Sequence, residues 1–108
     1  MQIDATKTEG KWTVMAVSGR IDGHTAPEFE AACKAQLDKG TVWLAVDLAG
    51  VQYMSSAGLR VLLATLKSAK GKSGGMALVS PQENVREVLE ISGFSSIFSI
   101  VADVQKLS

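Results

Sequence analysis

The start of the chain alternates between apolar and polar positions. Residues 2–8 (QIDATKT) and 11–18 (KWTVMAVS) both show this alternation, and they flank Glu9-Gly10. A period of two places every second side chain on the same face of a strand. A glycine between two such runs is typical of a tight turn. The pattern therefore predicts a β-hairpin with one buried face.

A helical pattern follows the hairpin. Its apolar positions are spaced by three and four, as on one face of a helix: Phe29, Ala32, Cys33 and Leu37. Thr25, with Glu28 three residues later, has the form of a capping box, and Pro27 suits a first turn. Gly40 ends the pattern. We expect a helix over residues 25–39.

The middle of the chain predicts a buried strand and a second helix. Residues 41–48 (TVWLAVDL) are almost continuously apolar, as in a central strand covered on at least one face and partly on the other. After residues 50–55, four leucines recur at helical spacing, with basic residues largely on the other side: Leu59, Leu62, Leu63 and Leu66 against Arg60, Lys67 and Lys70. We expect a helix over about 56–70.

The last third repeats the strand and helix order. A flexible turn at 71–75 precedes a short apolar strand at 76–79, and Ser80 then stands where a helix cap is expected. The inward positions of this third helix, which stops at Gly93, are Val85, Val88, Leu89 and Ile91. The tail is weakly patterned, with a strand expected near 97–100 and a short helix after it.

Alternation of strands and helices from residue 41 onward favours an α/β fold with parallel crossover connections. The opening hairpin adds antiparallel pairing, so the sheet should be mixed. With 108 residues, 46% of them hydrophobic, the chain has the size and apolar content of one domain, residues 1–108.

The charge balance, apolar runs and cysteine content exclude several classes of partner and cellular location. Eleven lysines and arginines balance eleven aspartates and glutamates, so no net positive field attracts nucleic acid or an anionic membrane. No apolar run approaches the ~20 residues that a membrane span needs. Cys33 is the single cysteine, which rules out an internal disulfide. Together with an N-terminus unlike a signal peptide, these features predict a cytoplasmic protein with no nucleic-acid partner and no membrane insertion.

Catalytic and cofactor motifs are weak. Gly71-Lys72-Ser73 imitates the end of a phosphate-binding loop, but Leu66 stands where the motif needs glycine, and the segment follows a helix rather than a strand. Ser56 lies in Met-Ser-Ser-Ala-Gly rather than in the Gly-x-Ser-x-Gly of a nucleophile elbow, and no second titratable group marks His24, the single histidine, as a general base. One histidine and one cysteine give little basis for a metal site. We expect no enzyme activity and no cofactor.

The most informative residues are two serines between the buried strand and the second helix. A helix N-terminus presents unpaired N–H groups and roughly half a positive charge, so it accommodates a phosphate or carboxylate. Either Ser55 or Ser56 could cap the helix, and capping alone would explain a serine here. Ala57-Gly58 would leave the first turn open to close approach by another molecule.

This segment resembles the signature of STAS domains (sulphate transporter and anti-sigma-factor antagonist), in which a strand leads to Asp-Ser-Ser/Thr-Gly-Leu at the start of a helix. Gly19-Arg20-Ile21-Asp22 resembles the family's Gly-x-Leu/Ile-Asp segment, and residues 80–94 resemble its third helix and ending. The resemblance covers nearly the whole chain. It implies the STAS fold: a mixed sheet of four to five strands, opened by a hairpin, with about four helices mainly on one face.

The same resemblance implies the site residues. Met54-Ser55-Ser56-Ala57-Gly58-Leu59 places Ser56 on the family's phosphate acceptor, while Ser55 stands where Asp is usual and Ala57 where Ser or Thr is usual. The implied partner-binding surface contains the residues of this segment and of the loop after the second strand: Asp22, Ser55, Ser56, Ala57, Gly58 and Arg60. For Asp22, a turn-forming role beside Gly23 is the alternative.

The partners are also implied by the family. An anti-sigma factor antagonist binds, in its unphosphorylated state, an anti-sigma factor of the histidine-kinase-like ATPase type, and so frees the sigma factor. That partner is also the serine kinase, and a PP2C-type serine phosphatase would reset the switch. The alternative is a constitutive STAS adaptor, for example of a lipid-transport ATPase, which phosphorylation does not regulate. Ser55 in place of the usual Asp slightly favours this alternative.

Overall fold

The computed structural model describes residues 1–4 and 6–107. Its α-helices are α1 (Ala26–Asp38), α2 (Ser56–Gly71) and α3 (Glu83–Ile91). Its strands are β1 (Gln2–Ile3), β2 (Lys7–Glu9), β3 (Trp12–Ile21), β4 (Trp43–Met54), β5 (Gly75–Val79) and β6 (Ser99–Val101). Two single 3-10 turns, η1 (Phe94–Ser96) and η2 (Val104–Lys106), belong to the tail. Within the described ranges, no helix has the length and apolar character that crossing a bilayer requires.

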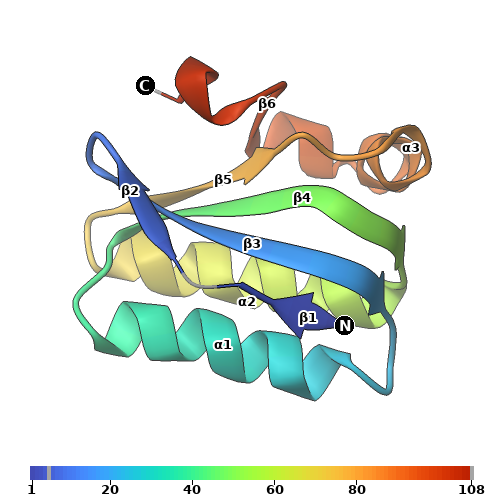
Figure 1. Ribbon diagram of the computed structural model, residues 1–108, viewed down its shortest axis with the longest axis horizontal. Coiled ribbons are helices and arrows are strands. Elements are labelled where there is room, and N and C mark those ends of the chain that lie inside the picture. The colour runs from blue at the N-terminus through green and yellow to red at the C-terminus, as the bar shows by residue number, and fades with distance from the viewer. Residues whose placement is uncertain (5, 108) are drawn as a thin grey trace.

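The strands form one mixed sheet in the order β1-β3-β4-β5-β6, with β2 also paired to β3. Strands β3 to β6 are parallel, whereas β1 and β2 run antiparallel to β3. Figure 1 shows α1 and α2 side by side along one face of this sheet, and the C-terminal segment on the other. The mixed α/β fold predicted from the sequence is confirmed, with three α-helices rather than about four and a sixth short strand.

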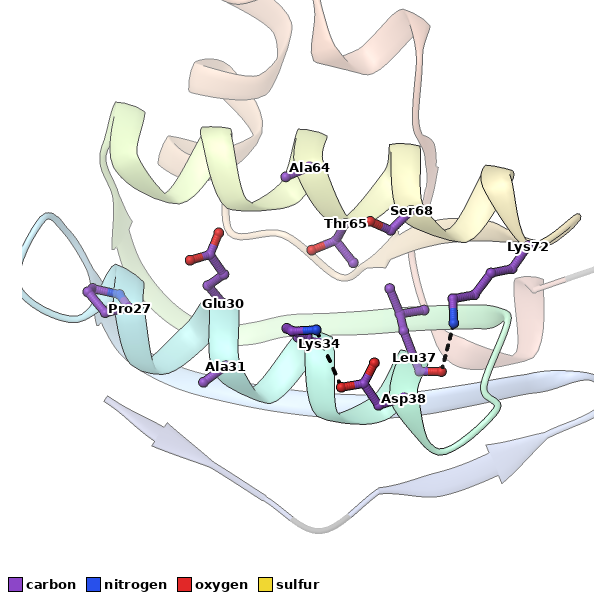
Figure 2. Close-up of a pocket in the computed structure, with 10 residues that line it drawn as sticks. All are labelled: Pro27, Glu30, Ala31, Lys34, Leu37, Asp38, Ala64, Thr65, Ser68 and Lys72. Atoms are coloured by element: carbon purple, nitrogen blue, oxygen red, sulfur yellow. Dashed lines mark hydrogen bonds and ion pairs between the residues drawn. The ribbon is translucent and has the colours of Figure 1, made fainter.

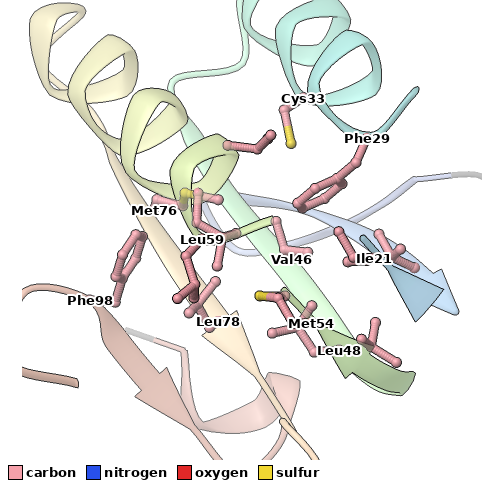
Figure 3. Packing of buried hydrophobic residues seen from close by; sticks show 14 of the residues in the cluster. Ile21, Phe29, Cys33, Val46, Leu48, Met54, Leu59, Met76, Leu78 and Phe98 are labelled. Carbon is pink, nitrogen blue, oxygen red and sulfur yellow. The ribbon is translucent and has the colours of Figure 1, made fainter. Parts of the chain in front are cut away.

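The main core lies between the sheet and the helices (Figure 3). Strand residues such as Val46 and Leu78 are fully buried and meet Phe29 of α1 and Leu62 of α2. Helix α3 adds Val85 and Leu89 to the same cluster. Ile91, predicted to face inward, is 88% exposed, because it is the last residue of α3 and lies beyond the part of the helix that packs on the core. All three helices therefore bury their apolar stripes in one core on one face of the sheet.

The opposite face has a smaller cluster around the two tryptophans. Trp12 is buried and packs edge to face on Trp43, with ring centroids 5.4 Å apart. Val104 and Leu107 from the C-terminal tail also pack on this cluster. This face is covered by one turn of 3-10 helix and its flanks rather than by a layer of α-helices.

Strand β4 is longer than the sequence pattern predicts. It runs through Met54, past the expected end at Leu48, because parallel pairing with β3 continues through two register shifts. At Gly50 the strands come so close that an added Cβ would lie 2.7 Å from the Ser18 Cβ. β4 extends almost to the start of α2 because it pairs with β3 along this length. The hydrophobic pattern of the sequence does not show that pairing.

Two predicted helix caps are wrong. The Thr25 side chain does not cap α1; its Oγ1 instead accepts the Asp22 N–H and donates to the Arg20 carbonyl, both at 2.9 Å. Ser80 lies two residues before the N-cap of α3, Gln82, in a left-handed conformation with φ of 53°. Its hydroxyl donates to the Ala102 carbonyl. The Thr25 hydroxyl therefore binds the end of β3, and the Ser80 hydroxyl binds the backbone just after β6, so neither side chain caps a helix.

Candidate functional site

Parallel pairing of β3 and β4 brings the two candidate loops together. Arg20 pairs with Tyr53 and Ile21 with Met54, and the Ser55 N–H then donates to the Ile21 carbonyl at 2.8 Å. The chain leaves both strands at the same edge of the sheet. The turn at Asp22 and the start of α2 are therefore adjacent.

Ser55 is the N-cap of α2. Its backbone is extended, with φ of −91° and ψ of 175°, and its Oγ accepts the Ala57 N–H at 3.2 Å. Its carbonyl accepts the Leu59 N–H at 3.1 Å. The sequence left the cap open between two serines, and the geometry assigns it to Ser55.

Ser56 is the exposed first residue of α2. Because Ser55 supplies the capping oxygen, the Ser56 hydroxyl is not needed to hold the helix end. The N–H groups at a helix start and the positive end of the helix dipole stabilise an anion placed there. A phosphate on Ser56 would therefore be compatible with the folded helix.

The small residues Ala57 and Gly58 differ in exposure. Ala57 is half-buried and packs against the main core, whereas Gly58 is buried. A Cβ at Gly58 would lie 2.8 Å from both the Ile21 Cγ2 and the Met54 Cγ. The missing side chain at Gly58 thus serves close packing of α2 on the ends of β3 and β4.

Arg60 extends the candidate surface along α2. It is exposed and follows Ser56 by four residues, which places both on the same side of the helix. Its positive charge adds to that of the helix N-terminus. Anions near Ser56 therefore meet a favourable local potential.

Asp22 organises the neighbouring turn. Its Oδ1 accepts the N–H groups of His24 and Thr25 at 3.0 and 3.1 Å. The Thr25 and His24 hydrogen bonds, with the nearby Arg20 charge, outweigh partial burial and lower the pKa of this carboxyl below its ordinary value of 3.8. Asp22 is therefore a charged turn residue, and its other oxygen, Oδ2, lies 3.9 Å from the Arg20 Nε.

Sequence reasoning did not select Arg20 and Tyr53 as site residues. The Arg20 guanidinium lies 4.3 Å from the centre of the Tyr53 ring, and 40% of Tyr53 is exposed. The sequence contains only part of the information needed to find this pair. Tyr53 is a large aromatic residue just before the serines, but its pairing with Arg20 depends on strand register, which the sequence does not display.

Other reactive or hollow features lie apart from this surface. Cys33 is buried on α1, and burial raises the pKa of its thiol to about 12. Across the described ranges, no group of three or more His, Cys, Asp or Glu side chains could hold a metal ion.

A groove of about 560 Å³ separates α1 from α2 (Figure 2). Lys34 pairs with Asp38 at 3.5 Å, and the Lys72 Nζ donates to the Leu37 carbonyl at 3.4 Å. The Thr65 hydroxyl on its wall donates within α2. These polar groups already have partners in the chain, so the groove offers few groups to orient a ligand.

Known proteins resemble this chain in sequence over most of its length. The family model described as the STAS domain matches residues 2–107. The chain is 38% identical to BtrV of Bordetella bronchiseptica, a protein named as a putative anti-sigma factor antagonist, over 93% of this chain and 85% of that protein. It is 33% identical to the anti-sigma-B factor antagonist of Listeria monocytogenes, over 78% of this chain and 74% of that protein.

A solved structure has the same fold. The crystal structure of a protein from Thermotoga maritima described as a putative anti-sigma factor antagonist superposes with a TM-score of 0.88 at 25% identity. It covers 94% of this chain and 88% of that one.

Proposed function

This chain belongs to the STAS-domain family, and from that premise we propose that it is an anti-sigma factor antagonist switched off by phosphorylation of Ser56. In its unphosphorylated state it binds an anti-sigma factor and so frees the sigma factor. Two curated relatives, one named a putative anti-sigma factor antagonist at 38% identity and one an anti-sigma-B factor antagonist at 33% identity, support this assignment.

The observation that best supports a phosphorylation switch is that Ser55 and Ser56 have different positions at the start of α2. Ser55 caps α2, while Ser56 is exposed at its first position. A kinase can therefore modify Ser56 without removing the cap. The helix end and Arg60 offset part of the added charge within the free protein, so its fold should tolerate the phosphate.

A phosphate on Ser56 is expected to weaken partner binding far more than it affects the stability of the fold. A phosphate adds about −1.5 to −2 charges at neutral pH. On a close-packed contact surface these charges cost desolvation and repel any partner carboxylate. A coupling of ~3 kcal/mol corresponds to roughly a hundredfold change in affinity, so no large rearrangement is required.

The kinase is proposed to be the anti-sigma factor itself, an ATPase of the histidine-kinase-like type. A PP2C-type serine phosphatase would remove the phosphate and restore binding. The chain acts in this scheme as substrate and ligand and supplies no catalytic group.

Affinity measurements with matched Ser56 variants test the switch. Ser56→Ala should bind the anti-sigma factor like the unphosphorylated wild type, and Ser56→Glu should bind at least tenfold more weakly. Ser68→Glu, at an exposed position later in α2, is the control for added charge alone. Equal affinity of all four proteins would contradict an electrostatic switch at Ser56.

The constitutive adaptor stays a second candidate because Ser55 replaces the family's usual Asp. A neutral residue cannot supply a carboxylate beside the acceptor. If Ser55→Asp is phosphorylated by an anti-sigma kinase and the wild type is not, the adaptor becomes the better assignment.

A further inference from the structure

Tyr53 is an exposed aromatic residue at the edge of the candidate surface. Among the described residues, the exposed large hydrophobic side chains are Tyr53 (40%), Ile91 (88%) and Ile97 (45%). Ile91 and Ile97 belong to the end of α3 and the segment after it. Tyr53 stands two residues before the cap of α2, next to the turn at Asp22.

Arg20 holds this aromatic residue in a defined arrangement. Its guanidinium stacks 4.3 Å from the Tyr53 ring centre, and its Nε lies 3.9 Å from the Asp22 carboxylate. Asp22 is itself fixed by two backbone N–H groups. The three side chains thus form an ordered cluster, which reduces the conformational entropy lost when a partner binds.

The cluster faces away from the helix layer. Ile21 and Met54, the next residue pair along the two strands, are buried in the main core under α1 and α2. Side chains alternate along a strand, so Arg20 and Tyr53 point toward the opposite side of the sheet. A partner that covers Ser56 and Tyr53 together must extend around the end of the sheet.

We propose that Arg20 and Tyr53 form a specificity-determining contact for the anti-sigma factor. This inference rests on the proposed function, and it adds a second contact region that phosphorylation does not modify. Tyrosine and arginine, together with tryptophan, are the residue types enriched at binding hot spots. The partner should present an apolar side chain to the Tyr53 ring and an acidic side chain to Arg20.

We expect an acidic side chain on the partner because Arg20 retains N–H donors that can bind a carboxylate. A guanidinium has five N–H donors, and within the chain the Arg20 Cζ lies over the Tyr53 ring while its Nε lies 3.9 Å from the Asp22 Oδ2. The Arg20 side chain is 61% exposed. A partner carboxylate can therefore bind the remaining amino groups while the ring stack stays intact.

The test compares affinities of single variants for the histidine-kinase-like anti-sigma factor of the same organism that binds the wild type. Tyr53→Ala and Arg20→Ala should each raise Kd at least tenfold. Tyr53→Phe keeps the ring and should stay within about threefold. Ile91→Ala, an exposed hydrophobic side chain outside the cluster, should leave Kd unchanged.

Charge reversal tests the chemistry of the partner. Arg20→Glu should weaken binding further than Arg20→Ala, because it places a carboxylate against the partner's acidic side chain. Equal affinities of these two variants would overturn the acidic contact. Circular dichroism of each variant distinguishes lost contact from lost fold.

The affinity measurements distinguish failure of the Arg20–Tyr53 contact from failure of the proposed function. If the wild type binds the anti-sigma factor and Tyr53→Ala and Arg20→Ala bind equally well, the Arg20–Tyr53 contact is overturned and the function stands. If the wild type binds no anti-sigma factor, the proposed function fails, and the contact fails with it.

Discussion

Gly58 is required by packing inside the chain. Its hydrogen faces Ile21 and Met54, which leave no room for a methyl group. Overpacking costs about 1–3 kcal/mol, and the better helix propensity of alanine returns about 1 kcal/mol. We expect Gly58→Ala to lower the free energy of unfolding by about 1 kcal/mol in urea titrations.

Gly71→Ala is the matched control at the other end of α2, since a Cβ there meets no atom within 4 Å. It should be neutral or slightly stabilising. If both alanine variants stabilise the protein, the close contact at Gly58 is not limiting.

Asp22 predicts a pH-dependent contribution to stability. Its pKa is lower in the folded chain than its ordinary value of 3.8. The ionised carboxylate therefore stabilises the fold above that ordinary value, and this contribution disappears as pH falls through the lowered folded pKa. Asp22→Asn should be less stable than wild type at neutral pH, with the difference shrinking in acid. A difference that stays constant with pH would contradict the assignment.

At the level of elements, the Ser55 side chain stabilises the start of α2 as its N-cap. Ser55→Ala removes the oxygen that accepts the Ala57 N–H and should cost about 1 kcal/mol. Ser55→Asp keeps an acceptor and adds a charge that the helix end favours, so it should be as stable as wild type or slightly more stable.

Ser68→Ala, an exposed serine within α2, is the control for the substitution type. It should be neutral or stabilising in thermal unfolding because alanine is the better helix former. Equal losses in Ser55→Ala and Ser68→Ala would argue against the cap.

The elements that could be predicted from sequence are those with local signals. Spacing of apolar residues located α1, α2 and α3 to within a few residues, because each helix buries one stripe. The end of β4 could not be predicted, since its last residues are held by pairing with β3 across two register shifts. Thr25 and Ser80 matched cap patterns, yet their hydroxyls bind backbone carbonyls outside the helices, at the end of β3 and just after β6.

The candidate site was predictable in part for the same reason. Position at a strand-to-helix junction and the family resemblance selected Ser55 and Ser56, but not which of them caps the helix. The cluster of Arg20 and Tyr53 depends on register between residues 33 positions apart. No local pattern contains that information.

At the scale of the whole molecule, the proposed switch changes binding while the fold stays intact. Ser56 lies outside both hydrophobic clusters, at an end of α2 that favours negative charge. Ser56→Glu should therefore unfold at the wild-type temperature or slightly above it, a gain of about 0.3–1 kcal/mol. A clear fall in unfolding temperature would indicate a switch that acts by loosening the fold.

Phosphorylation of Ser56 is measured by intact mass and peptide mapping after incubation with ATP and each histidine-kinase-like anti-sigma kinase of the same organism. We expect a single phosphate on Ser56 with one of these kinases, and none on Ser56→Ala. Absence of phosphate with every kinase, or labelling of Ser56→Ala at the wild-type level, would contradict the proposed switch.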